Sequence, residues 1–106
     1  MKKSKNKFQN MKKGYFIVRM NIKNDEIFKK YPPLSTKAVK KFGGKYLIRG
    51  GTFDVVEGEW PAERTTVVEF ENFEKAKEFY NSLDYKEAKK VRKESANTDF
   101  ILIEGY

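Results

Sequence analysis

The chain contains neither cysteine nor histidine. Their absence excludes disulfide bridges, thiolate nucleophiles, Cys/His zinc sites, histidine-ligated haem and the Ser-His-Asp and Cys-His pairs of nucleophilic catalysis. The sequence also lacks any apolar run approaching the roughly 20 residues of a membrane-spanning helix. We therefore expect no metal site, no resident cofactor and no membrane partner, so that Asp, Glu, Tyr, Lys and Arg are left to carry any chemistry.

The composition nevertheless supports a folded core. Hydrophobic residues make up 39% of the 106 residues, and aromatic residues make up 15%. A chain of this length is too short for two ordinary cores and long enough for one. We predict a single domain.

Positive charge is concentrated at the N-terminus. The formal net charge is +8, and six lysines lie in the first 13 residues, which contain no acid. Residues 14–106 hold 17 basic and 15 acidic side chains, so this part is nearly neutral. We interpret residues 1–13 as a solvated, disordered leader rather than a nucleic-acid-binding arm, with either Met1 or Met11 as the native start. Because the leader has no apolar stretch of a secretory signal, we expect a cytoplasmic protein.

The first periodic segments predict a strand and a helix in two pieces. Residues 15–22 are rich in aromatic and β-branched side chains and alternate along a strand. Asn24 or Asp25 is placed to begin a helix that Pro32-Pro33 interrupts, Ser35 to cap its second piece, and Gly43 to end it in a left-handed conformation.

The rest of the chain predicts two further strands, a helical region and a last strand. Asn72 is placed to cap the helical region, which Asp84 continues. The strands are expected at 45–49, continuing at 53–56 after a kink at Gly50-Gly51, then at 64–71 and 100–104. The order β-α-β-β-α-β indicates an α+β, ferredoxin-like fold, with a four-stranded antiparallel sheet and the helices on one face.

The second face of this sheet is unusually apolar for a face in water. Six of the ten residues that we assign to it are apolar or aromatic. These ten are Tyr15, Ile17, Arg19, Leu47, Arg49, Val67, Glu69, Phe100, Leu102 and Glu104. A contiguous apolar surface of this size marks an interface, so we expect a homodimer that covers it.

Several segments together resemble a known family. They are Gly14–Arg19, Phe42–Gly51, Glu57–Trp60, Val67–Phe70 and Tyr80–Tyr85. In this combination, over about residues 12–106, the chain is similar to a small bacterial family of uncharacterised function in the dimeric α/β-barrel superfamily.

The resemblance implies two ferredoxin-like protomers that pack their sheets face to face. Relatives in the superfamily include cofactor-free monooxygenases of polyketide-like phenols, haem-handling enzymes, isomerases and stress-response binding proteins. Haem enzymes of that group commonly use a histidine ligand, and this chain departs from them because it has none.

Two groups of polar residues are candidates for a ligand site. Arg49 with Gly50 and Gly51 can form a turn that cradles an anion, although a β-bulge that bends the sheet edge is the simpler explanation of the glycines. Arg19 and Glu69 project from neighbouring strands to the same face. They form either a structural ion pair or a site in which a buried Glu69 acts as a base or hydrogen-bond acceptor.

Two aromatic residues complete the candidate set. Trp60 in the hairpin either packs across the turn or against a partner, or closes a ligand site as a flat apolar wall. Tyr85 has the spacing of a core residue with a hydrogen-bonded hydroxyl. We retain both as ligand-binding candidates.

Three functions are compatible with these features. We favour a homodimeric module that binds a small organic molecule and acts on it, if at all, by monooxygenase- or isomerase-like chemistry without metal or cofactor. A ligand-free structural or regulatory dimer is the alternative. RNA binding is disfavoured because residues 64–71 contain no glycine and two acids, unlike the aromatic third strand of RNA-recognition motifs.

Overall fold

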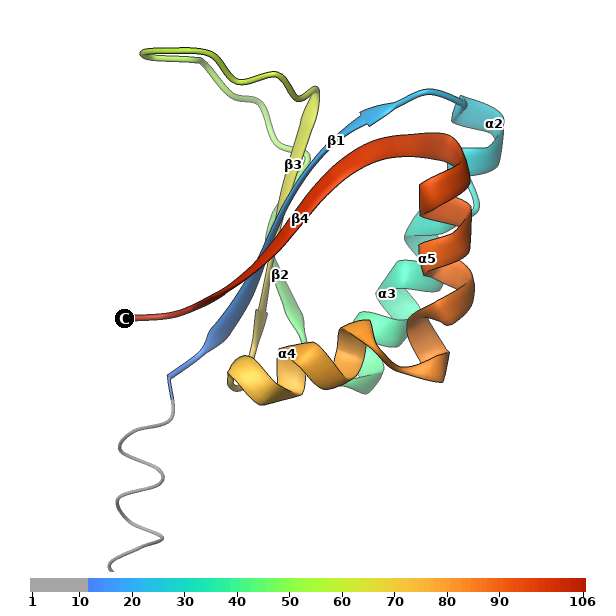
Figure 1. Ribbon diagram of the computed structural model, residues 1–106, viewed down its shortest axis with the longest axis vertical. Helices are drawn as coiled ribbons and strands as arrows, with labels where there is room; N and C mark the ends of the chain where they lie inside the picture. Colours follow the sequence, from blue (N-terminus) through green and yellow to red (C-terminus); the bar gives the residue numbers. More distant parts are fainter. Residues whose placement is uncertain (1–11) are drawn as a thin grey trace, which may run out of the picture.

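The computed structural model describes residues 12–106, which form one antiparallel sheet with helices on one side (Figure 1). The elements are β1 (Gly14–Ile22), α2 (Asp25–Phe28), α3 (Tyr31–Lys41), β2 (Lys45–Arg49), β3 (Arg64–Phe70), α4 (Phe73–Tyr80), α5 (Leu83–Ser95) and β4 (Ala96–Glu104). The strand order is β2-β3-β1-β4, and every neighbouring pair is antiparallel. The predicted α+β, ferredoxin-like arrangement is confirmed. We call the helix-covered side of the sheet the inner face and the opposite side the outer face.

Side-chain caps define the starts of two helices as predicted. The side chain of Asn24 accepts a hydrogen bond from the amide of Ile27, and that of Asn72 accepts one from Lys75. The predicted cap at Ser35 is wrong. Helix α3 already begins at Tyr31 because the two prolines occupy its first turn, where a backbone N–H has no helical partner to lose.

Aromatic rings fill the space between the inner face and the helices. Phe79 on α4 lies 5.0 Å from Phe70 and 4.6 Å from Tyr85, measured between ring centroids. Phe16 on β1 lies 6.0 Å from both Phe70 and Phe79. All four side chains are buried, so the core of the single chain is complete on this side of the sheet.

A β-bulge in β2 moves Arg49 to the inner face. Tyr46 pairs with Val68 but Ile48 pairs with Val67, so Leu47 is an additional residue in the strand. Arg49 therefore lies beside Thr66 on the helix side, and our placement of Arg49 on the outer face is wrong. The sequence suggested a bulge at Gly50-Gly51, whereas the structure has it three residues earlier.

The register of β4 was also wrong in our prediction. The strand begins at Ala96, four residues before its expected start, and Phe100 and Leu102 pack against the core. The ring of Phe100 lies 5.0 Å from that of Phe16, so the aromatic side chain is held on the inner side. Glu104 shares this register, and neither it nor the other two residues belongs to the outer face.

The outer face keeps its apolar character with different members. Its residues include Tyr15, Ile17, Arg19, Lys45, Ile48, Thr65, Val67, Glu69, Asp99, Ile101 and Ile103. Ile17 pairs with Val67 on one side and Ile101 on the other, which places three apolar side chains at the centre. Polar residues surround this centre. The conclusion that the face is apolar therefore survives the errors in register.

The connection between β2 and β3 extends away from the sheet and the helices as a long arm, drawn in light green in Figure 1. We define the arm as residues 51–61. The predicted continuation of a strand at 53–56 is wrong, because the arm contains no strand. Gly50 adopts φ +67, a conformation that favours glycine, and turns the chain out of β2.

The prediction of a disordered leader falls mostly on residues 1–11, which lie outside the described residues. Lys13 is ordered next to the domain, because its carbonyl accepts a 2.7 Å hydrogen bond from the amide of Gly105. Among the described helices, none combines the length and the apolar character needed to cross a membrane.

Candidate functional site

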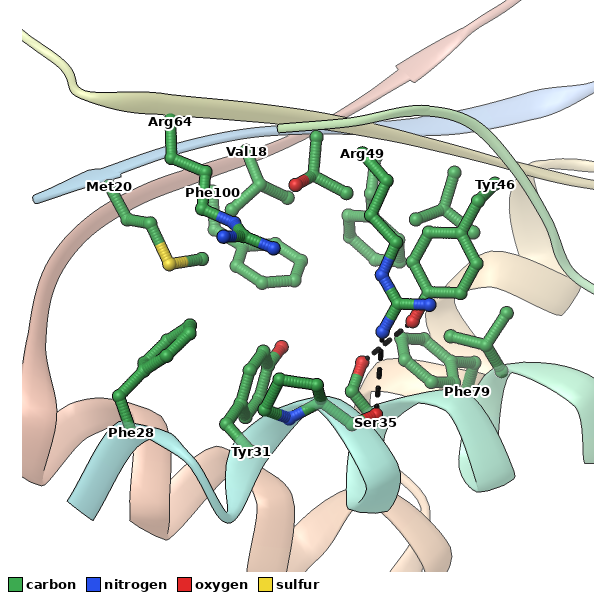
Figure 2. A pocket seen from close by; sticks show the side chains of 15 residues that line it. Val18, Met20, Phe28, Tyr31, Ser35, Tyr46, Arg49, Arg64, Phe79 and Phe100 are labelled. Atoms are coloured by element: carbon green, nitrogen blue, oxygen red, sulfur yellow. Dashed lines mark hydrogen bonds between the residues drawn. The ribbon is translucent and has the colours of Figure 1, made fainter. Parts of the chain in front are cut away.

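A pocket opens between the inner face and helices α2 and α3 (Figure 2). The hollow has a cavity volume of about 30 Å³. Its walls are mainly apolar, with Val18, Met20, Phe28, Phe79 and Phe100 among them. A guest larger than water therefore requires the side chains at the mouth to move.

Two arginines, from neighbouring strands, line the mouth. Arg64 begins β3, and its Cζ lies 5.8 Å from the centre of the Phe28 ring. Within residues 12–106 its side chain makes no hydrogen bond or ion pair. No carboxylate belongs to the 15 residues that line the pocket. The mouth therefore presents a guanidinium group whose hydrogen-bonding capacity is unused in this part of the chain.

Arg49 is anchored more firmly than Arg64. Its Nη2 donates to Thr36 Oγ1 over 2.8 Å and to the carbonyl of Pro32 over 3.4 Å, and its Cζ lies 4.0 Å above the ring of Tyr46. These contacts tie β2 to the start of α3. The side chain still has donors left, since a guanidinium carries five N–H groups.

Three hydroxyl groups add polar contacts inside the pocket. Ser35 and Tyr46 share a 2.9 Å hydrogen bond between their hydroxyl oxygens, drawn as a dashed line in Figure 2. The hydroxyl of Tyr31 contacts that of Tyr85, which lies behind the pocket wall. Apolar walls with a few polar groups at fixed positions are typical of small-molecule sites.

A buried cation stands behind this wall. Arg92 on α5 is only 4% exposed, its Nε donates to the hydroxyl of Tyr85 over 3.4 Å, and its Cζ lies 4.8 Å from the centre of the Phe100 ring. Burial raises the pKa values of Tyr31 and Tyr85, so both stay protonated at neutral pH. Tyr31 can therefore donate a hydrogen bond into the pocket but is a poor general base.

The seven predicted site residues separate into four places. Arg49 lines the pocket, and Gly50 lies against Arg64, whose Cζ is 3.2 Å from where a β-carbon on this glycine would stand. Tyr85 belongs to the buried network behind the pocket. Gly51 lies in the arm. The other three, Arg19, Glu69 and Trp60, lie on or over the outer face.

Arg19 and Glu69 do not form the predicted ion pair. Arg19 Nε lies 3.1 Å from Asp99 Oδ2, and Glu69 Oε2 accepts a 2.9 Å hydrogen bond from the hydroxyl of Tyr15. The late start that we assigned to β4 hid Asp99 as a strand residue. Both polar pairs are local cross-strand contacts.

Trp60 contacts the outer face from the arm. Its Nε1 donates to Thr65 Oγ1 over 3.0 Å, and Arg19 Cζ lies 5.2 Å from its ring centre. It does not line the pocket. Its position agrees with packing across the turn, the simpler of the two interpretations made from sequence.

Sequence reasoning missed Arg64, Tyr31 and Tyr46 as pocket residues. Arg64 lies two and four residues before Thr66 and Val68 in β3, so all three side chains share the face under the helices. This alternation could have identified Arg64 from the sequence. In the sequence, Tyr31 has the helical spacing of an apolar core residue, in line with Phe28 and Leu34. Nothing in the sequence alone indicates that its hydroxyl reaches a cavity.

Comparisons with known proteins agree on the fold. The model of a family described as a domain of unknown function, DUF1330, matches residues 13–106. None of the curated proteins matches the chain. Among solved structures, a protein of unknown function from Rhodopseudomonas palustris has a TM-score of 0.75 at 15% identity, with 100% of this chain and 94% of that chain covered.

Two further structures are similar over most of the chain. The cofactor-independent oxygenase SnoaB from Streptomyces nogalater has a TM-score of 0.52 at 8% identity, covering 90% of this chain and 94% of its own. A dimeric protein of unknown function with a ferredoxin-like fold, from Bacteroides fragilis, has a TM-score of 0.52 at 16% identity, covering 88% and 96%. At these identities the similarity shows the fold alone.

Proposed function

Since the chain belongs to the DUF1330 family, whose function is unknown, we propose from the site itself that it binds a small organic anion in the pocket between the sheet and α2 and α3. The observation that carries this proposal is the pair Arg49 and Arg64 at the mouth of an apolar hollow without a carboxylate. Arginine binds carboxylates through paired, charge-assisted hydrogen bonds. The apolar walls suit the hydrocarbon part of the same ligand.

Binding is favoured over base-catalysed chemistry by the polar groups present. The pocket is lined by hydroxyl groups and guanidinium groups, and the pKa of its buried Tyr31 is raised by burial. A general base is most effective when its pKa lies near the working pH. Activity like that of the cofactor-independent oxygenase fold neighbour is therefore the second candidate, supported by the similar fold.

The working unit in this proposal is a homodimer joined through the outer face. The apolar centre at Ile17, Val67 and Ile101 supports it, and a dimer has been described for the fold neighbour from Bacteroides fragilis. RNA binding receives no support, because this centre is aliphatic and the one aromatic residue of the outer face, Tyr15, donates to Glu69. A cytoplasmic location remains a prediction from the sequence.

A thermal-shift panel tests the binding proposal. Benzoate, hydroxybenzoates, aliphatic hydroxy acids and matching neutral phenols are added to the full chain, since a ligand that binds the native state raises the melting temperature. We expect carboxylates to stabilise the protein and the neutral phenols not to. Stabilisation by the phenols alone, or by no member of the panel, would contradict the proposal.

Substitution of Arg64 locates the site. A charge-assisted hydrogen bond is worth about 1.5–3 kcal/mol, so Arg64→Gln should weaken binding of the best carboxylate by roughly 10- to 100-fold. Lys37→Gln is the matched control, because Lys37 is exposed on α3 and outside the pocket lining. Equal affinity of the natural chain, Arg64→Gln and Lys37→Gln for the carboxylate would show that the ligand binds outside this pocket.

A further inference from the structure

The arm presents apolar side chains that the described part of the chain, residues 12–106, leaves uncovered. Phe53, Val55, Val56 and Trp60 are 45%, 47%, 94% and 41% exposed, respectively. Large exposed apolar patches on a folded protein mark interaction surfaces. The arm is therefore a candidate for contact with a partner.

The backbone of the arm is also without regular pairing. Within residues 51–61 the one described hydrogen bond between backbone groups lies at the end of the arm, where the carbonyl of Trp60 accepts from the amide of Ala62. Such a segment gains little stability from its own chain. A surface that packs over it would supply the missing apolar contacts.

A groove runs between the arm and the edge strand β2. Its volume is about 830 Å³, and it is lined on one side by Leu47 and Ile48 and on the other by Phe53, Val55 and Trp60. Both β2 residues are 48% exposed. We call this feature the arm groove.

The arm groove is continuous with the outer face. Ile48 belongs to both, because it lines the groove and pairs with Val67 at the apolar centre. Trp60 also connects the arm groove with the outer face, because it lines the groove and contacts Thr65 and Arg19. A partner seated on the outer face therefore reaches the arm groove along Ile48.

Charge selects the kind of partner. The arm carries Asp54, Glu57 and Glu59 and no basic residue, whereas all 23 basic residues of the chain lie outside it. Its negative charge opposes nucleic acid and anionic lipid surfaces and favours a basic protein surface. Because the arm groove continues the apolar outer face that a second copy is proposed to cover, a second copy of this chain is the protein partner that also reaches the arm.

We propose that the arm groove binds a second copy of this chain, so that each arm is part of the homodimer interface. This inference extends the dimer of the proposed function from the outer face to the arm, and it does not depend on ligand binding. In this dimer, Val56 passes from an exposed position to a contact with the partner.

The first test compares two exposed apolar residues. Val56→Asp places a charge at a side chain that is 94% exposed, so the fold of one chain should be unaffected. Leu83→Asp is the matched control, because Leu83 is 84% exposed at the start of α5, away from the arm. We expect Val56→Asp to raise the dissociation constant of the dimer at least tenfold and Leu83→Asp to leave it unchanged, as measured by analytical ultracentrifugation. A Val56→Asp protein that dimerises like the control would overturn the proposal.

The second test uses the absence of cysteine in the natural chain. A Val56→Cys protein carries a single attachment point for a photoactivatable crosslinker, and Leu83→Cys serves as control. In a mixture of isotope-labelled and unlabelled chains, irradiation of Val56→Cys should give covalent dimers and mixed-isotope crosslinked peptides. The control should remain monomeric on a denaturing gel. Crosslinks confined to one chain would contradict the proposal.

Binding measurements separate this inference from the pocket. If the carboxylate panel fails while the Val56 variants behave as expected, the arm proposal stands and the proposed ligand function falls. If Ile17→Asp gives monomers while Val56→Asp does not, the outer face alone forms the interface and the arm proposal falls.

Discussion

The two faces of the sheet differ in how completely one chain covers them. On the inner face, Phe70, Phe79 and Tyr85 are no more than 2% exposed under the helices. On the outer face, Ile101 and Ile103 are 53% and 47% exposed. Both faces carry apolar side chains, but within residues 12–106 only the inner face is covered. The difference is what the proposed dimer explains, since a second copy would cover the outer face as the helices cover the inner one.

Buried polar groups reinforce this difference. The inner side can hold the Tyr31, Tyr85 and Arg92 network because the helices exclude water from it. The polar pairs of the outer face, Arg19 with Asp99 and Tyr15 with Glu69, lie toward its margins and keep contact with solvent. This arrangement leaves the centre free for apolar contact with another protein.

The largest effect is expected from truncation of the core on the inner face. Phe79→Ala removes a side chain that is 2% exposed and lies near four other aromatic rings. The expected loss is about 3–5 kcal/mol in the free energy of unfolding, measured by denaturant titration. Truncation of an outer-face residue, Ile101→Ala, should lower the free energy of unfolding of a monomer by clearly less. Equal costs would remove the distinction between the faces.

Association should depend on the centre of the outer face. Ile17→Asp buries a charge without a partner in the dimer, and we expect a loss of at least 100-fold in affinity, or about 3 kcal/mol. Size-exclusion chromatography with light scattering measures the mass. Lys37→Asp on the helix side is the control and should remain dimeric. An Ile17→Asp protein with the mass of a dimer would place the interface elsewhere.

The buried network should contribute a smaller amount. Tyr85→Phe keeps the ring and removes the hydroxyl that accepts from Arg92, whose Nη2 already has no hydrogen-bond partner in the described chain. Leaving such a buried donor unsatisfied costs about 1–3 kcal/mol. Tyr80→Phe is a suitable control. A melting temperature unchanged by Tyr85→Phe would show that water replaces the lost hydroxyl.

The smallest effect at neutral pH concerns the ionisation of the same tyrosines. Burial raises the pKa values of Tyr31 and Tyr85 in the folded state, so the stability linked to them is complete below their unfolded pKa of about 10 and is lost as pH rises above it. In an ultraviolet titration, these two of the six tyrosines should ionise only when the chain unfolds. Ionisation of all six in the native protein would contradict their burial.

The order of helices and strands was predictable from the sequence, because the spacing of apolar residues and the helix-capping residues depend only on neighbouring positions in the chain. Alternation from Tyr15 to Ile22 and the capping residues Asn24 and Asn72 gave the strand and two helix starts correctly. Ser35 was misassigned because a proline pair stops one helix and also begins the next. The prolines were correctly interpreted as an interruption between two helical pieces, but the start of the second piece was placed one turn too late.

The face of each strand was harder to predict where every residue is apolar. Phe100, Ile101, Leu102 and Ile103 show no alternation, so their sides are decided by packing of Phe100 against Phe16. The bulge at Leu47 reversed Arg49 in the same way and brought it into the pocket. The site could not be assembled from sequence because it depends on these two registers.

Sedimentation equilibrium over a range of protein concentrations tests the central claim, that a second copy covers the outer face. The account predicts a species of twice the 12.5 kDa mass of one chain that dissociates on dilution, and a melting temperature that rises with concentration. A folded protein that keeps the mass of one chain, with a melting temperature independent of concentration, would contradict it.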